Sequence, residues 1–148
     1  MPTYSSAPLR GAWLVLGLAT AMLQGCSETA QAPAASTNRV FAADQAGGAK
    51  SCQVGKIAVT DGQATETTMK MANDGGWCAF SVNQRGKPYA TGLLPNRPEH
   101  GKVYVHQVGD HTRIDYTPFR GFVGTDSFAV KLVPGDGVVR VAVTVAGQ

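Results

Sequence analysis

The residues of this chain that could do chemistry begin with three histidines, His100, His106 and His111. The dipeptide Gly109-Asp110 indicates a two-residue turn. That turn makes His106 and His111 diagonal neighbours on one face of a hairpin, with Asp115 further along. Two imidazoles and a carboxylate form a ligand set that suits zinc. Histidine on a polar strand face is more often simply solvated, and His100 has no evident partner, so we expect no metal and no cofactor.

The sequence carries no arrangement typical of a hydrolase or of a nucleotide-binding enzyme. It has no G-x-S-x-G nucleophile elbow and no catalytic order of Ser, His and Asp. Its Gly-rich stretches do not precede a helical segment, which argues against a phosphate-binding loop or a dinucleotide-binding turn. Its Asp-containing turns lack the spaced oxygen ligands of a calcium loop. We therefore predict that the protein is not an enzyme, and a metal-dependent enzyme built on the histidines ranks behind the binding roles given below.

Residues 83 to 102 form the candidate binding segment, which is strongly basic. The residues that would make the contacts are Arg85, Lys87, Tyr89, Arg97 and Lys102. Glu99 alone opposes the four cations, and the tyrosine is available for stacking. Such a segment suits an anionic envelope polymer or a partner protein, although a solvated loop has the same composition. The net charge of +3 is too small to predict a nucleic-acid partner.

The first 25 residues have the features of an export signal. Arg10 precedes an apolar run, GAWLVLGLATAMLQG, which is shorter than the ~20 residues that a membrane-spanning helix needs. We therefore predict a signal peptide over residues 1–25. The end of this segment, Leu23-Gln24-Gly25-Cys26, resembles the lipobox of bacterial lipoproteins.

The lipobox resemblance implies that Cys26 carries lipid and becomes the mature N-terminus, so that membrane lipid is a partner. Ser27, rather than Asp, follows the cysteine, which implies sorting to the outer membrane, and we expect the protein to face the periplasm. Several acyl chains, at ~0.8 kcal/mol per buried CH₂, would make this anchoring durable. The alternative is ordinary cleavage further on, near QAPAAS, which would leave a soluble periplasmic or secreted protein.

Two cysteines, Cys52 and Cys78, remain once Cys26 is assigned to the anchor. Export places them in an oxidising compartment, where a pair most simply forms a disulfide. A closed loop of about 27 residues contributes roughly 3.5 kcal/mol to stability in the chain-entropy model. A metal site is the weaker alternative, because C-x-x-C spacing is absent.

Composition divides the rest of the chain into a tether and a domain. Residues 26–49 are rich in Ala, Ser and Gly, which is typical of a flexible tether, and Val40 with Phe41 is their only bulky apolar pair. In residues 50–148, short Val- and Thr-rich segments alternate with turn residues, as in an all-β sandwich.

The first strands of the predicted domain follow an alternating pattern. We expect a bulge at Gly55 that turns both halves of residues 52–60 inward. The polar, Thr-rich residues 63–71 are typical of an edge strand, entered through a hairpin turn at Asp61-Gly62. The next strand, residues 77–82, would point three side chains into the core, namely Cys78, Phe80 and Val82.

The clearest hairpin covers residues 102–117, with its turn at Gly109-Asp110. One face is polar and expected to meet solvent: Tyr104, His106, Val108, His111, Arg113 and Asp115. The other face is expected in the core: Val103, Val105, Ile114 and Tyr116. A last strand pair, residues 125–133 and 138–146, would bury Phe128, Val130, Leu132, Val139, Val141, Val143 and Val145.

The stretch YTPFRGFVGTDSF, residues 116 to 128, carries a specific motif. Its Pro118 must end a strand, and Asp126 can accept hydrogen bonds from turn N–H groups. The order Y-x-P and then GF-x-G-x-D-x-F resembles the signature of bacterial immunoglobulin-like (cadherin-like) domains. The matching residues are Tyr116, Pro118, Gly121, Phe122, Gly124, Asp126 and Phe128.

This second resemblance covers residues 100 to 146, including the two final strands. It implies an immunoglobulin-like, antiparallel β-sandwich of seven to eight strands that serves adhesion, spacing or binding. The seven matching residues then form a structural corner rather than a catalytic turn. The disulfide is not part of the signature.

The sequence as a whole predicts a lipid-anchored, non-catalytic module of the cell envelope that acts by binding or scaffolding. The alternative is a small envelope inhibitor or an accessory subunit of an enzyme complex, which would work through the basic segment.

Overall fold

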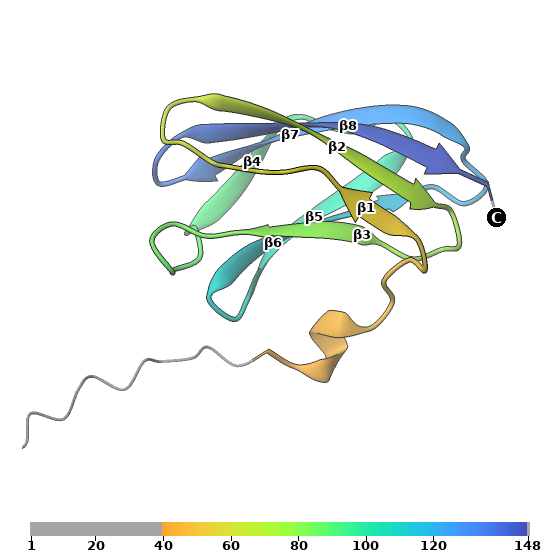
Figure 1. Cartoon of the computed structure of the whole chain (residues 1–148), viewed down its shortest axis with the longest axis horizontal. Coiled ribbons are helices and arrows are strands. Elements are labelled where there is room, and N and C mark those ends of the chain that lie inside the picture. Colours follow the sequence, from red (N-terminus) through yellow and green to blue (C-terminus); the bar gives the residue numbers. More distant parts are fainter. Residues whose placement is uncertain (1–39, 148) are drawn as a thin grey trace, which may run out of the picture. The chain divides into compact units, whose positions relative to one another are not determined.

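The computed structural model describes residues 40 to 147, which form a sandwich of two β-sheets (Figure 1). The predicted signal peptide, Cys26 and most of the tether lie outside the described residues. The elements are the 3-10 helix η1 (Ala42–Gln45) and the strands β1 (Cys52–Val54), β2 (Ala64–Ala72), β3 (Cys78–Val82), β4 (Thr91–Asn96), β5 (Gly101–Val108), β6 (His111–Pro118), β7 (Gly124–Val133) and β8 (Gly137–Ala146). The predicted all-β sandwich with one disulfide is confirmed. Within the described range no helix has the length and apolarity to cross a membrane.

The larger sheet has the strand order β1-β2-β8-β7-β4, and the smaller sheet has the order β3-β6-β5. Neighbouring strands are antiparallel, as predicted, except that β2 runs parallel to β8. The prediction of an edge strand over residues 63–71 is wrong, because β2 lies between β1 and β8. Its exposed Thr, Glu and Lys residues point to water because one face of this sheet is open, and not because a neighbouring strand is missing.

The core lies between the two sheets, where every second residue points inward. All the predicted core residues of β7 and β8 are at most 2% exposed: Phe128, Val130, Leu132, Val139, Val141, Val143 and Val145. The predicted inward residues of β3 are at most 7% exposed: Cys78, Phe80 and Val82. The alternation of apolar residues therefore identified the core of these three strands.

The first strand is shorter than the sequence suggested. β1 ends at Val54, and the expected continuation with a bulge at Gly55 does not form. The Gly55 N–H still donates to the Thr68 carbonyl at 2.9 Å, after which the chain leaves the sheet. Ile57 and Val59 pack against the core from this irregular segment as half-buried side chains.

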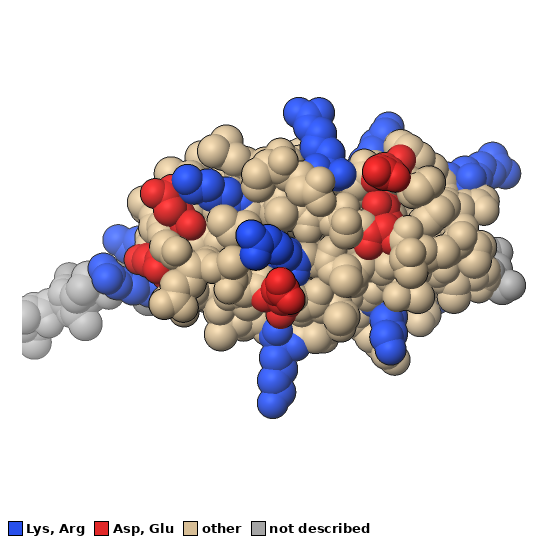
Figure 2. All heavy atoms as spheres, turned by 90° about the horizontal axis from the view of Figure 1, so that it is seen from above, with Lys and Arg blue, Asp and Glu red and all other residues tan. Residues whose placement is uncertain are grey.

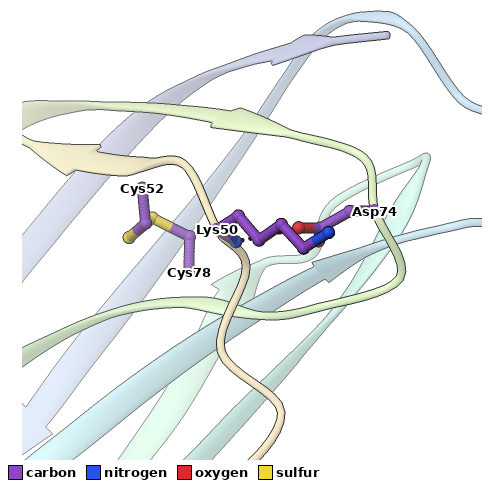
Figure 3. Close-up of a disulfide and its surroundings, with 4 residues drawn as sticks. All are labelled: Lys50, Cys52, Asp74 and Cys78. Atoms are coloured by element: carbon purple, nitrogen blue, oxygen red, sulfur yellow. Dashed lines mark hydrogen bonds between the residues drawn. A yellow bond between two sulfur atoms is a disulfide. The ribbon is translucent and has the colours of Figure 1, made fainter. Parts of the chain in front are cut away.

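The predicted disulfide between Cys52 and Cys78 is confirmed, with an S–S distance of 1.97 Å (Figure 3). It joins β1 of the larger sheet to the start of β3 in the smaller sheet. Beside it, the Lys50 backbone N–H donates to Asp74 Oδ2 at 2.8 Å, which ties the start of the domain to the loop between β2 and β3.

The hairpin of β5 and β6 has the predicted register, in which Val108 pairs with His111 and His106 pairs with Arg113. The prediction that its polar face meets solvent is wrong for Asp115, which is 6% exposed. It holds only in part for His106, Val108 and Arg113, which are half-buried. Residues that precede β1 lie along this face and contact the Arg113 guanidinium (Figure 1).

Candidate functional site

The candidate site is a cluster of polar and aromatic side chains on the outer face of the smaller sheet. Arg113 lies at its centre and donates to Asp115 through Nε at 2.7 Å and through Nη2 at 3.0 Å. His106 Nε2 lies 3.1 Å from Asp115 Oδ2, and its ring packs against Tyr104 at a centroid distance of 4.5 Å. The other side of the guanidinium lies over the Trp77 ring, 4.3 Å from its centroid.

Strand register explains why these residues meet. Arg113 and Asp115 are two positions apart on β6, so their side chains share a face. Ala79 of β3 pairs with Asp115, and its small side chain lets Arg113 extend across to Trp77. Asp115 is a buried carboxylate with a bidentate arginine partner, which is a charge-assisted arrangement that holds the guanidinium in one orientation.

Residues 41–49, which we call the strap, cover Trp77 and Arg113. Arg113 Nη1 donates to the carbonyl of Asp44, and Trp77 Nε1 donates to the carbonyl of Ala46 at 3.0 Å. The backbone of Trp77 completes the contact, since its N–H donates to Gly47 O at 3.1 Å and its carbonyl accepts from Ala49 N–H at 2.8 Å. The strap is thus held mainly through its own backbone atoms, and only the Ala49 side chain at its end packs against the core.

One glycine position allows the strap to lie this close. A Cβ at Gly48 would lie 3.5 Å from the Trp77 ring, which is an ordinary van der Waals contact, so a small side chain would fit there. A Cβ at Gly76 would lie 2.4 Å from the Ala49 nitrogen, a distance that no side chain can occupy. The loop before β3 therefore needs glycine where the strap crosses it.

Asp74 fixes the end of the strap to the same loop. Its carboxylate accepts from the backbone N–H groups of Lys50 at 2.8 Å and Gly76 at 3.0 Å (Figure 3). These two hydrogen bonds, that from Lys50 first, hold the pKa of Asp74 below its usual value. The contacts of the folded domain therefore begin before residue 50.

The histidines do not form the zinc arrangement that their spacing allowed. His106 meets Asp115, but His111 forms no hydrogen bond with either of them. In residues 40 to 147 no group of three or more His, Cys, Asp or Glu side chains is placed to hold a metal ion. His100, which had no evident partner in the sequence, stacks on Phe122 at a centroid distance of 4.3 Å.

The basic segment does not form one surface. Tyr89 is 3% exposed, so its predicted stacking role is wrong: its backbone N–H donates to Thr112 Oγ1 at 2.8 Å, and burial raises the pKa of its phenol, with Asp61 adding to the effect. The four cations Arg85, Lys87, Arg97 and Lys102 divide into two pairs that flank β4, which spans about 20 Å at ~3.3 Å per residue.

The stretch after β6 is a corner that is fixed by one carboxylate. Asp126 accepts from the backbone N–H groups of Glu99 at 3.0 Å and His100 at 2.9 Å, and from the Tyr116 hydroxyl at 2.9 Å. Burial alone would raise the pKa of Asp126, but these donors and the Ser127 N–H outweigh it and lower the pKa. Burial and the bond to Asp126 raise the pKa of Tyr116.

The remaining motif residues complete this corner. β6 ends at Pro118, and Phe128 stacks on Tyr116 at 5.8 Å in the core. Gly121 and Gly124 have φ values of +78° and +143°, which side chains rarely adopt. Phe119 and Val123 of the same loop point outward and are 46% and 60% exposed.

The outer face of the larger sheet holds a shallow depression of about 600 Å³. It crosses β2, β8, β7 and β4, and small outward side chains such as Ala129 and Ala142 leave its space. Figure 2, seen from above Figure 1, shows Lys and Arg side chains interspersed with acidic ones, with uncharged surface between them. The charges on this side are mixed rather than gathered into one basic stripe.

No known family model matches this sequence, and no curated protein is similar to it.

The sequence did not predict that the residues around Trp77 and Arg113 form a site together. The available signal was Trp77, which falls on the opposite parity from the inward residues Cys78 and Phe80. An outward tryptophan is unusual, so its position indicates a covering segment or a partner.

Proposed function

We propose that this protein is a lipid-anchored, non-catalytic module of the bacterial cell envelope that acts by binding or scaffolding. The observation that carries the proposal is that the buried charged cluster binds the chain segment that precedes the domain. Arg113, held by Asp115, binds the chain segment that leads from the anchor side into the domain. The cluster therefore holds the connecting segment against the sandwich in this structure, which suits a module that must present its surfaces.

The two sequence resemblances support this role. The lipobox at residues 23–26 argues for lipid on Cys26, sorting to the outer membrane and a periplasmic orientation. The immunoglobulin-like signature argues for a domain used in adhesion, spacing or binding, and the observed β-sandwich suits it. The alternative localisation, a soluble periplasmic or secreted protein, follows if cleavage falls further along the chain.

The alternative role as an envelope inhibitor or accessory subunit relied on the basic segment as one contact surface. The burial of Tyr89 and the division of the four cations into two pairs weaken it. Each pair alone still suits an anionic polymer. The binding and scaffolding role is therefore preferred.

Fractionation of a bacterium that expresses the chain tests the anchor. Cys26→Ser should move the protein from the membrane fraction to the soluble periplasm, because no thiol remains to take the lipid. Ser27→Asp is the matched control, since it keeps the lipidated cysteine and should change only the membrane to which the protein is sorted. If Cys26→Ser still sediments with membranes after a salt wash, the anchor lies elsewhere.

Capture of partners from detergent-solubilised envelope tests the binding role. The lipidated chain is expected to retain one or more envelope components that do not bind the unfolded, reduced protein. Recovery of no component at any salt concentration would contradict a binding function.

A further inference from the structure

We propose that Trp77 and Arg113 form a peptide-binding site, which the strap occupies here and which an extended, small-residue segment of a partner protein can occupy in its place. The inference rests on the binding role proposed above and names its class of partner. It does not depend on the lipid anchor.

The site recognises backbone atoms rather than side chains. Its donors are the Arg113 guanidinium, the Trp77 indole and the Trp77 N–H, and each donates to a carbonyl of the strap. The Trp77 carbonyl adds one acceptor, which takes the Ala49 N–H. Gly48 and Trp77 pair as in a parallel β-bridge, so the strap binds as a short added strand. Any extended peptide offers the same groups.

Shape restricts the ligand to small residues. Gly47 adopts a φ of +83°, and its Cβ position lies 3.4 Å from the Trp77 indole nitrogen. Gly48 lies against the same ring, and Gly76 leaves room only for a bare backbone beside Ala49. A segment with large side chains at the two central positions would be held away from the indole. The site therefore selects a Gly- or Ala-rich strand.

The Arg113 guanidinium is oriented independently of the strap. Both oxygens of Asp115 orient Arg113, and His106 supports the carboxylate from the neighbouring strand. Trp77 directly precedes Cys78, which is bonded to Cys52. A guanidinium group that is already held in place loses little freedom when it binds a peptide, which favours affinity.

The strap itself is easy to displace. None of the residues of η1 is buried, and Val40 and Phe41 are 51% and 63% exposed. Segments with few buried apolar contacts and exposed hydrogen bonds open more readily than the core. A partner segment therefore competes only with the local docking of the strap, and the sandwich stays folded.

Tryptophan fluorescence of the full chain provides the test. The chain has two tryptophans, and a Trp13→Phe background leaves Trp77 as the single reporter whether or not the signal peptide is removed. Gly47→Val opens the strap without touching the site, because valine is strained at its φ of +83°. Gly86→Val is the matched control, with a φ of +77° and open space around it, far from the strap in sequence. The probe is a synthetic peptide of residues 40–50.

We expect Gly47→Val to shift Trp77 emission to longer wavelength and to increase its quenching by acrylamide, while Gly86→Val leaves both unchanged. The peptide should reverse these changes saturably at millimolar concentrations, which is the order of the effective concentration of a tethered segment. The same peptide with Gly47→Val should have no effect. Arg113→Lys should weaken the peptide's effect roughly tenfold, because one charge-assisted hydrogen bond is lost.

A chain that lacks residues 41–49 serves as a second, strap-free protein and decides the matter if Gly47→Val fails to open the strap. If the peptide produces no saturable change in this chain, the site does not bind peptides and the proposal is refuted. Membrane fractionation of Cys26→Ser is read separately, so failure of the peptide site is distinguishable from failure of the anchor.

Discussion

The corner at Asp126 offers the sharpest test of whether the motif after β6 serves stability or recognition. Asp126→Ala removes one carboxylate that accepts hydrogen bonds from the preceding loop and from the core. The Glu99 and His100 N–H groups and the Tyr116 hydroxyl all lose their acceptor. The substitution leaves no new side chain that could clash.

The loss of stability depends on which of these donors are buried and therefore cannot bond to water instead. Tyr116 is 0% exposed, so its hydroxyl would be left unsatisfied in the core, at a cost of about 1–3 kcal/mol. Glu99 and His100 lie at exposed positions where water replaces the carboxylate, so their loss adds about 0.5–1 kcal/mol together. The expected total is about 1.5–4 kcal/mol, which corresponds to a fall in Tm of roughly 7–20 °C for a domain of this size.

Thermal and urea unfolding of Asp126→Ala and three further variants measure this. Tyr116→Phe removes the same buried hydrogen bond from the other side, and the double variant should therefore cost less than the sum of the two single ones. Arg120→Ala, an exposed change in the same loop, should stay within about 0.5 kcal/mol. If Asp126→Ala melts like the wild type while partner binding disappears, the loop is a recognition site and the reasoning is refuted.

Three further outcomes follow from the same structure. Gly124→Val should cost about 1–3 kcal/mol in thermal melts, because a φ of +143° strains a β-branched residue, and an unchanged Tm would contradict this. The lowered pKa of Asp126 means that its contribution is complete above the unfolded pKa of ~3.9 and is lost as pH falls through the lower folded value. Asp126→Asn should therefore reduce the acid dependence of the unfolding free energy below about pH 4, and identical slopes would count against it. Reduction of Cys52 and Cys78 should add two hydrogens to the mass and lower stability by roughly 3.5 kcal/mol, whereas free thiols in the oxidised protein would exclude the bridge.

Alternation and turn chemistry made most of the sandwich predictable. The turn at Gly109-Asp110 correctly predicted which residues pair across the hairpin. The alternating valines of β8 correctly predicted which face of that strand points inward. The parallel pairing of β2 with β8 was not predictable, because a polar outer face looks alike on an edge strand and on a central strand of a one-sided sheet. The early end of β1 depends on tertiary contacts of residues 55–60 that no local pattern encodes.

Residue types identified parts of the candidate site but not their arrangement. His106, Arg113 and Asp115 were placed on one face, which is correct, yet that face was expected in solvent. The arginine that pairs with Asp115 contacts a segment more than sixty residues earlier in the chain, which hairpin periodicity cannot anticipate. The basic segment does not form one surface, for a related reason. Its four cations are close in sequence, but they flank the two ends of β4.

The strap shows why a bound segment can resemble a linker in sequence. Its contacts use backbone carbonyls and N–H groups, so docking on Trp77 places no demand on side chains except that they be small. Small, polar, Gly-containing composition is also what a flexible tether requires. Composition therefore cannot separate the two, and the distinguishing signal lies in the receptor: an outward tryptophan beside a buried ion pair. A partner segment that fits the same site would be equally inconspicuous in its own sequence, so Trp77 fluorescence is a better way to find it than any motif.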